Sequence, residues 1–239
     1  MSRHAILTHD EHAQLRVRTE AGAALGDAVM AAFTVPLEFR RIQHDFPIVF
    51  RRDNQTGRFS ALALLGFESG ENLFLEGDRW EADYKPLSLA IQPFLVGRAD
   101  DDQAPSQIHI DLDHPRIATN GEGILLFDAA GRPTPYVERI GDMLAELDEG
   151  HRTSESFFAA LERYELLEPF FLDVELRNGS KHRMVGYHMI NEDKLRALEP
   201  GAVAELHTEG HLMPIFMALA SLSNLSVLIE RKNRRNGDG

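Results

Sequence analysis

The chain contains no cysteine. It therefore forms no disulfide, no thiolate nucleophile and no cysteine-ligated zinc or iron–sulfur centre, and those chemistries are excluded. Positive charge is also scarce, because 25 Lys and Arg residues stand against 38 Asp and Glu residues, which leaves a net charge of −13. A charge of this sign repels phosphate backbones and anionic lipid surfaces, so we expect no nucleic-acid partner.

Long hydrophobic runs are missing as well. The most apolar stretch, LMPIFMALASL at residues 212–222, is shorter than the roughly 20 residues that span a bilayer, so we expect no transmembrane segment. The first residues, MSRHAILTHDEHAQL, show no apolar region followed by a small-residue cleavage site. We therefore expect a soluble, cytoplasmic protein. The basic cluster at residues 231–235 is interpreted as cations at the negative end of a last helix.

Several motifs that define enzyme classes are absent. The sequence has no GxSxG, P-loop, GxGxxG or HExxH pattern, so the usual support for serine hydrolases, nucleotide-binding proteins and zincins is lost. What the chain has is the composition of a folded protein, with 43% hydrophobic and 26% charged residues. Its 239 residues suit one large domain or two small ones.

The first half is predicted to be rich in short strands. Residues 47–52 and 58–67 are apolar segments separated by the turn sequence DNQTG, which predicts a hairpin. Turn residues then separate further apolar segments, which lie at residues 73–75, 94–97, 108–112 and 124–127. A helix is also expected at residues 21–33, ending close to Pro36.

The second half is predicted to form helices around a hairpin. Thr134 and Pro135 suit a helix start, and apolar residues recur at helical spacing until Gly150; a second helix should begin near Thr153 and end before Pro169. Three later helices are expected at residues 191–198, 200–210 and about 213–231. The fold class is therefore α+β, with a β-rich portion at residues 1–128 and a helix–hairpin–helix portion at residues 129–239, packed as a single compact unit.

The sequence FFLDVELRNGSKHRMVGYHMI carries the strongest hairpin signal. Asn178-Gly179 suits a two-residue type I′ turn, because both positions need a positive φ. That turn would place Glu175 opposite His182, and a slip of one residue is the alternative. In the last helix, Ser221, Ser223 and Asn224 interrupt an apolar surface, and we expect the serines to hydrogen-bond back to carbonyls one turn earlier rather than to contact a partner.

Several segments together resemble the SapC family of bacterial proteins, in the same order along the chain. They are EFRRIQHDFPIVFRRDNQTGRF, GFESGENLFLEGDRW, QPFLVG, IHIDLDHPR, LLEPFFLDVELRNGSKHRMVGY and IFMALASLSNLSVLIERKN. The resemblance extends from about residue 10 to about residue 233. The family takes its name from a component associated with a bacterial surface layer, and its members often carry a peptide-transporter permease label. A permease needs membrane spans, and none is expected here.

The resemblance also implies an association with genes for outer-membrane receptors, tryptophan-halogenase-like flavoproteins and cupin-like proteins. It supplies no catalytic residues. We therefore expect an accessory protein that binds another protein or a surface-related ligand, and whether it is also an enzyme stays open.

The stretch QIHIDLDHPR at residues 107–116 suggests a metal site. On a strand, His109 and Asp111 project from the same face, and they supply two arms of the two-histidine, one-carboxylate site that binds non-haem Fe(II). The third arm would be a later histidine, with His182 or His188 preferred among those available. This hypothesis predicts an iron-dependent oxygenase. The simpler interpretation, which we favour, is the polar face of a half-exposed strand.

A second candidate surrounds the only tryptophan. Trp80 follows Glu71 and Asp78 closely in the sequence, and an indole beside carboxylates suits a sugar or a cation. The alternative is a pair of turns that flank a core tryptophan, which we consider the better interpretation.

Overall fold

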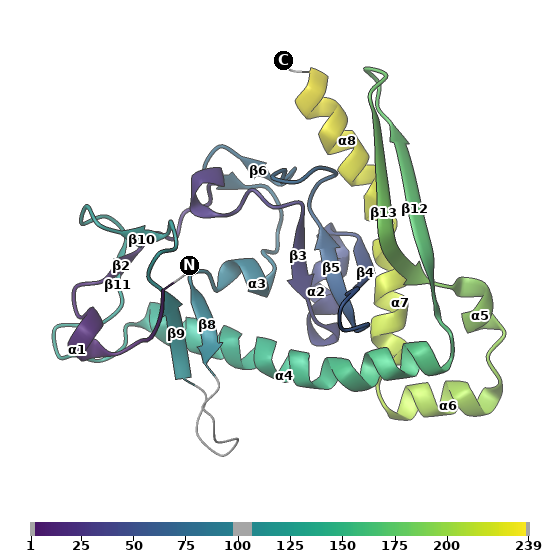
Figure 1. The fold of residues 1–239 in the computed structure, drawn as a ribbon, viewed down its shortest axis with the longest axis horizontal. Helices are drawn as coiled ribbons and strands as arrows, with labels where there is room; N and C mark the ends of the chain where they lie inside the picture. Colours follow the sequence, from purple (N-terminus) through teal and green to yellow (C-terminus); the bar gives the residue numbers. More distant parts are fainter. Residues whose placement is uncertain (1–2, 98–106, 238–239) are drawn as a thin grey trace. The chain divides into compact units, whose positions relative to one another are not determined.

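The structure, a computed structural model, describes residues 3–97 and 107–237. Antiparallel sheets occupy the N-terminal half and helices dominate the C-terminal half, so the predicted α+β class is confirmed (Figure 1). The chain divides into two compact units, each of which combines segments from before and after residue 128. The first comprises Met1–Ala28, Leu75–Glu81 and Leu87–Glu149, and the second comprises Val29–Phe74, Ala82–Pro86 and Gly150–Gly239.

In its described residues, the first unit contains three small antiparallel sheets, with strand orders β1-β9-β8, β10-β2-β11 and β6-β7. Its elements are β1 (His4–Ile6), α1 (His9–His12), β2 (Arg16–Val17), η1 (Ala23–Leu25), β6 (Leu75–Glu76), β7 (Arg79–Trp80), α3 (Leu87–Ala90), β8 (Phe94–Gly97), β9 (Gln107–Asp111), β10 (Ile117–Ala118), β11 (Ile124–Leu125) and the first half of α4 (Pro135–Arg163). The predicted apolar face of α4 is confirmed, because Val137, Ile140 and Leu144 are buried against Phe94 and Ile110.

The second unit is built on one five-stranded antiparallel sheet with the order β12-β13-β4-β5-β3. Its elements are β3 (Ala31–Thr34), η2 (Pro36–Glu38), α2 (Phe39–Asp45), β4 (Ile48–Arg52), β5 (Phe59–Leu64), the second half of α4, β12 (Leu167–Glu175), β13 (Lys181–Ile190), α5 (Glu192–Arg196), α6 (Pro200–Thr208), α7 (Leu212–Ser221) and α8 (Asn224–Gly237). The predicted hairpin at residues 47–67 is confirmed as β4–β5.

Phenylalanine rings form the centre of this second core. Phe39, Phe50 and Phe157 are fully buried, and their ring centroids lie 6.0 to 6.5 Å from one another. They come from α2, β4 and α4, and burying each ring stabilises the fold by about 1.5–3 kcal/mol. The core therefore ties the sheet to the helices that cover it.

The prediction of a helix at residues 21–33 is wrong. That segment forms the short η1 and then strand β3, which pairs with β5. A buried ion pair explains the difference, because the Asp27 carboxylate lies 2.7 Å from Arg116 and also accepts a hydrogen bond from the amide of Gly22. Gly26 adopts φ +93°, which ends η1. A contact 89 residues away in sequence therefore overrides the local helical pattern.

The two helices predicted on either side of Gly150 are one helix, α4. Gly150 is a packing position rather than a stop, because a Cβ there would lie 2.4 Å from Cγ2 of Val35. Ser154 does not begin a new helix either. Its hydroxyl donates back to the carbonyl of Gly150 at 2.6 Å, within the continuous helix.

The hairpin of β12 and β13 is confirmed, and its register is the one-residue alternative. Lys181 lies opposite Glu175, and Val174 lies opposite His182. Three residues make the turn instead of two, since the amide of Gly179 bonds to the carbonyl of Leu176 and Gly179 has φ +82°. The loop is therefore a three-residue hairpin connection that ends in a left-handed glycine, which is a common type.

The last predicted helix is divided into α7 and α8 by a tight turn at residues 222–223. Ser221 and Ser223 bond back to the carbonyls of Ala218 and Ala220, as predicted. Among the residues that the structure describes, Leu212–Gly237 is long and apolar enough to cross a membrane. Its most apolar 18 residues have a mean hydropathy of 1.9. Core helices of soluble proteins satisfy the same criterion, so the expected lack of a membrane span stays a prediction.

Candidate functional site

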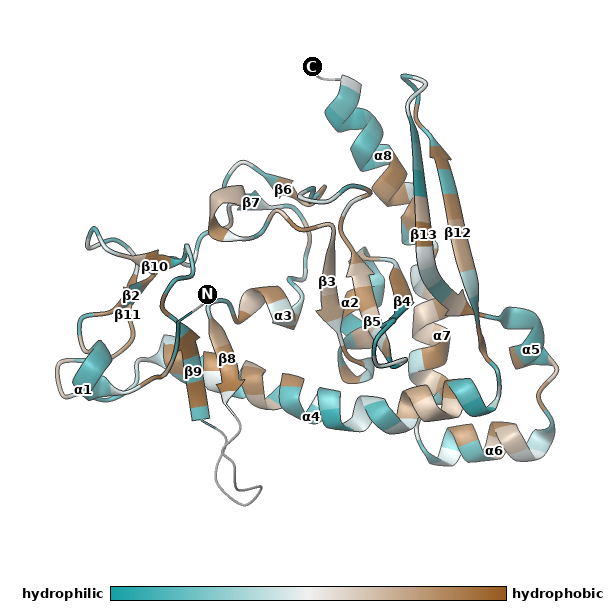
Figure 2. Cartoon of the chain, in the orientation of Figure 1, coloured by the Kyte–Doolittle hydropathy of each residue, from teal (hydrophilic) through white to brown (hydrophobic). Residues whose placement is uncertain are grey.

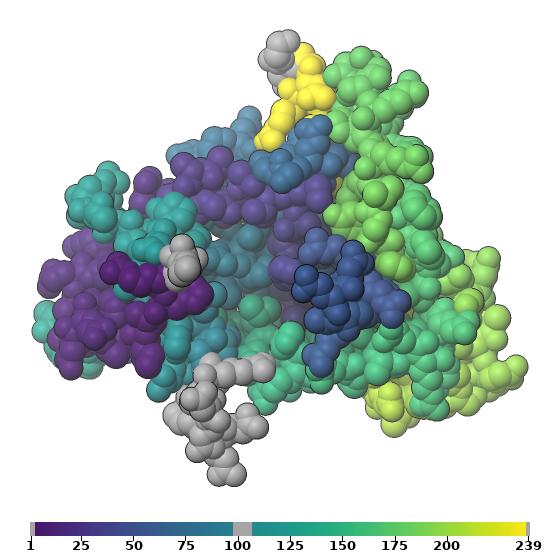
Figure 3. Space-filling model, viewed as in Figure 1, coloured from purple at the N-terminus to yellow at the C-terminus, as the bar shows by residue number. Residues whose placement is uncertain are grey.

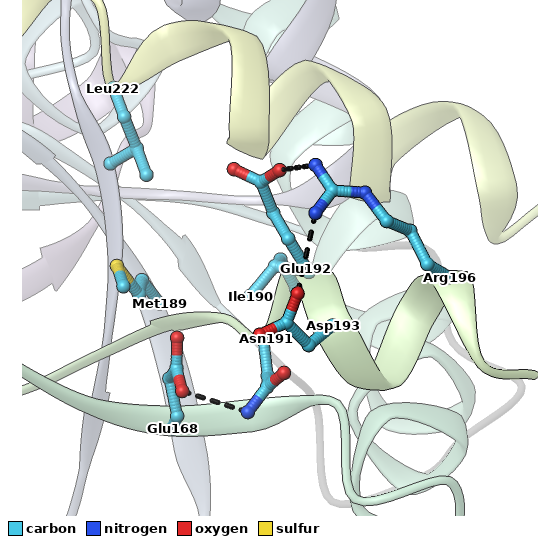
Figure 4. A pocket seen from close by; sticks show the side chains of 8 residues that line it. All are labelled: Glu168, Met189, Ile190, Asn191, Glu192, Asp193, Arg196 and Leu222. Atoms are coloured by element: carbon cyan, nitrogen blue, oxygen red, sulfur yellow. Dashed lines mark hydrogen bonds and ion pairs between the residues drawn. The ribbon is translucent and has the colours of Figure 1, made fainter.

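A cavity of about 260 Å³ lies at the base of the β12–β13 hairpin in the second unit (Figure 4). Its lining comes from the two strands, from α5 and from the turn between α7 and α8, and consists of Glu168, Met189, Ile190, Asn191, Glu192, Asp193, Arg196 and Leu222. Ligand pockets for drug-sized molecules measure about 300–1,000 Å³. This cavity is smaller, so it suits a single side chain or a small ligand group.

Local sequence signals position the polar walls of the cavity. Asn191 caps α5, as predicted, because its Oδ1 accepts a hydrogen bond from the amide of Lys194 at 2.8 Å. The Asn191 amide nitrogen donates to Glu168 at 2.8 Å, which ties the helix start to β12. Glu192 and Asp193 occupy the first turn of α5, where negative charge is favourable. The helix therefore presents two acidic side chains at the open rim of the cavity, where Glu192 and Asp193 are 55% and 96% exposed.

The charges of the lining do not cancel. Arg196 donates to Glu192 at 2.5 Å and to Asp193 at 3.3 Å, and it is the one cation among the lining residues. Three carboxylates and one guanidinium leave a surplus of two negative charges. Met189 and Leu222 supply apolar surface opposite α5 (Figure 4). A cationic group on an apolar stem, as in lysine or arginine, complements both features.

A second cluster of charges joins the hairpin, α8 and the loop before Phe74. Lys232 is only 5% exposed, and its ammonium donates to Glu71 at 2.6 Å and to Glu68 at 3.2 Å. Burial, the largest single influence, lowers the pKa of Lys232, but the hydrogen bonds and charges of Glu71 and Glu68 together raise it above its ordinary value of 10.5. Lys232 therefore stays charged at neutral pH.

His182 extends this cluster. Its Nδ1 lies 3.1 Å from Glu68, while its Nε2 is buried without a hydrogen-bond partner. Nearby, the end of α8 is linked to the hairpin turn, because Asn233 accepts a hydrogen bond from the amide of Arg177. In Figure 3 the yellow end of α8 lies against the green tip of the β12–β13 hairpin. Glu71 thus pairs with Lys232, and Glu68 pairs with both Lys232 and His182, so these contacts hold α8 and β13 against the loop.

His109 and Asp111 lie on β9 of the first unit, with side chains on the same face as expected. The His109 ring covers Gly97 on the neighbouring strand so closely that a Cβ at Gly97 would lie 2.0 Å from Cδ2 of His109. Asp111 accepts a hydrogen bond from the amide of Asp113 at 3.0 Å, which forms the turn that ends the strand. Both side chains thus have structural contacts within their unit, and the metal role stays a prediction.

The two other predicted metal ligands belong to the second unit. His188 lies on β13, six residues after His182, with its ring edge-on to Phe59 at 5.0 Å. Burial, and then the charge of Arg52, lower the pKa of His188 below its ordinary value of 6.5. A neutral imidazole is the form that binds a metal, but it is also the form that burial favours for a histidine without any metal role.

Trp80 and Asp78 belong to the first unit, whereas Glu71 belongs to the second. Trp80 lies opposite Leu75 in the small β6–β7 hairpin, and Asp78 is exposed in its turn. The expected turns are present, but Trp80 is only partly buried, so it is not the core tryptophan of that interpretation. Glu71 belongs to the Lys232 cluster described above, and ligand binding by these three residues stays a prediction.

Sequence reasoning missed a third group, His44, Asp45 and Asp83, whose potential ligand atoms lie within 4.8 Å of one another in the second unit. His44 and Asp83 are exposed, with 3.7 Å between Nε2 and Oδ2. Asp45 uses one oxygen to accept the amide hydrogen of Tyr84. A separation of 38 residues hides this group in the sequence. His44 and Asp83 are exposed to solvent and Asp45 is partly buried, and exposed acidic groups of this kind are common without an ion.

Fold and cavity together define an α+β protein with a small acidic pocket beside an edge hairpin of its main sheet. The family model for SapC matches residues 7–228, so the chain belongs to the SapC family, as its segments suggested. No match to the chain was found among the curated proteins or the solved structures.

Proposed function

We propose that this SapC-family protein is a soluble, cytoplasmic accessory protein that binds a partner protein through the pocket at the base of β12–β13. The partner would insert a lysine or arginine side chain between Glu168 and the acidic start of α5. The family's association with surface layers and outer-membrane receptors suggests a partner from a cell-surface system. The observation that carries the proposal is the surplus of negative charge in a cavity whose lining is part acidic and part apolar.

Three features support recognition of a basic side chain. The volume of about 260 Å³ suits one extended side chain better than a cofactor. Met189 and Leu222 can cover the apolar stem, while the carboxylates receive the charged end. Glu168 has one oxygen held by Asn191, which fixes its orientation before a ligand arrives. The net charge of −13 also favours encounter with a basic partner.

Titration calorimetry tests the proposal with defined peptides. The probe is a short peptide that carries one lysine between two leucines, and its control replaces the lysine with norleucine. We expect binding of the lysine peptide, weaker binding at higher salt, and loss of about tenfold in affinity in Glu168→Gln, since one charge contact is removed. Glu175→Gln, an exposed carboxylate on the same strand, is the matched control and should bind as the wild type does.

Two results would overturn this function. If the norleucine peptide binds as tightly as the lysine peptide, or Glu168→Gln binds like the wild type, the pocket does not recognise a cation. The rival oxygenase is tested on the same preparations by metal analysis. Iron bound by the wild type and lost in both His109→Ala and Asp111→Ala, together with turnover of a defined substrate, would establish an enzyme instead.

A further inference from the structure

A stripe of exposed residues runs along α7 and α8, and the structure leaves it uncovered in the second unit. Met213, Phe216 and Val227 are 56%, 56% and 46% exposed, and Ala220 and Ser223 between them are exposed as well. Figure 2 shows that α7 is hydrophobic along most of its length, whereas α8 becomes hydrophilic towards its end. Large apolar side chains rarely stay in water when they are arranged in a row.

The spacing of the stripe is that of a helix-packing seam. Successive members are separated by 3, 4, 3 and 4 residues, from Met213 to Phe216, Ala220, Ser223 and Val227. Within α7 this spacing keeps Met213, Phe216 and Ala220 on one face, and the exposed row continues through Ser223 in the turn to Val227 on α8. The small residues Ala220 and Ser223 lie in the middle, where two helices that cross approach most closely.

We propose that the stripe is the contact surface of a homodimer in which α7 and α8 of two copies pack antiparallel. A twofold axis near the turn at residues 222–223 then pairs Phe216 with Val227 of the second copy and Ala220 with Ser223 of the second copy. In every contacting pair the two residue numbers add up to 443. Each pair therefore occurs twice, once from each copy, as a twofold interface requires. A parallel arrangement would instead place Phe216 on Phe216.

Charge favours the same arrangement. Arg40 reaches the Met213 end of the stripe, with its guanidinium 3.2 Å from the Met213 sulfur. Glu230 follows Val227 by one turn, at the opposite end. The antiparallel seam brings Arg40 of one copy to Glu230 of the other, twice. A lipid surface is a poorer occupant, because a net charge of −13 is repelled by anionic headgroups.

Sedimentation equilibrium of the full chain tests the dimer, against a monomer mass of 26.9 kDa. A single helical seam is small, so we expect a dissociation constant on the order of micromolar. Phe216→Ser should weaken association at least about tenfold. Phe171→Ser is the matched control, because Phe171 is 62% exposed on β12, outside the stripe, and this variant should dimerise like the wild type. Glu168→Gln should also dimerise, which separates this inference from the proposed pocket.

A charge exchange tests the orientation. Arg40→Glu and Glu230→Arg should each lose self-association, because like charges then face each other, and an equimolar mixture of the two should recover it. Arg177→Gln controls for loss of the internal Arg177–Glu230 ion pair and should leave the dimer intact. A wild type that stays monomeric at several hundred micromolar overturns the proposal. So does a monomer that floats with phosphatidylcholine vesicles through Phe216, which would assign the stripe to a lipid surface.

Discussion

Ser221 offers a sharp test of how the second unit is held together. Its side chain is fully buried, and its hydroxyl accepts a hydrogen bond from the amide of Ile48 at 2.8 Å while it donates to Ala218 at 2.6 Å. This hydroxyl therefore links α7 to the first residue of β4, 173 residues away in sequence. Removing the hydroxyl leaves a buried backbone donor without this acceptor.

The expected cost follows from that unpaired amide. A buried donor that loses its partner costs about 1–3 kcal/mol. For a chain of this size each kcal/mol lowers the melting temperature by about 2–4 °C, so Ser221→Ala should melt about 2–12 °C lower than the wild type. Far-UV circular dichroism measures the loss of unfolding free energy in urea and the fall in melting temperature on heating. The single tryptophan is unsuitable as the probe, because Trp80 belongs to the first unit.

Ser226→Ala is the matched control for this experiment. Ser226 makes the same kind of bond, to the carbonyl of Ser223 at 2.8 Å, but it is exposed on α8. Its substitution should change stability by no more than about 0.5 kcal/mol. If Ser221→Ala and Ser226→Ala lose equal stability, the link between Ser221 and Ile48 contributes nothing and the reasoning fails.

Two further predictions concern titratable groups. Lys232→Met should lower the free energy of unfolding in urea by about 2–4 kcal/mol, because Glu71, whose side chain is only 11% exposed, loses its cation. Lys181→Met removes an exposed ion pair and should cost less than about 1 kcal/mol, so equal losses in the two variants would contradict a structural role for Lys232. The lowered pKa of His188 means that the unfolded chain binds its proton more readily, so stability should fall as pH drops below about 6.5 towards the folded-state pKa. Urea midpoints at pH 7.5 and 5.5 should differ less in His188→Gln, and an unchanged difference would rule this contribution out.

Elements with strong local signals were predictable. The β4–β5 hairpin, the β12–β13 hairpin and the Asn191 cap of α5 each depend on turn or capping residues next to the element they define. The segment at residues 21–33 was not predictable in the same way, because Asp27 pairs with Arg116 far along the chain. Gly150 shows the same limit, since its role is decided by Val35 against it.

The candidate site divides along similar lines. The acidic first turn of α5 is visible in the sequence, but its meeting with Glu168 depends on the pairing of β12 and β13. Glu71 and His182 were predicted to have ligand and metal roles. In the structure Glu71 contacts Lys232 and His182 contacts Glu68, and no sequence spacing predicts either contact. Buried charges need partners, and the partner can come from any distance along the chain.

By itself, the sequence determined the fold class, the SapC resemblance, the exclusion of cysteine chemistry and the acidic charge of the molecule, because these depend on composition and short-range patterns. Only the tertiary structure decided the register of the hairpin, the pocket at its base and the exposed stripe on α7 and α8. Exposure and pairing are properties of which surfaces meet, and surfaces meet according to the packing of the whole chain.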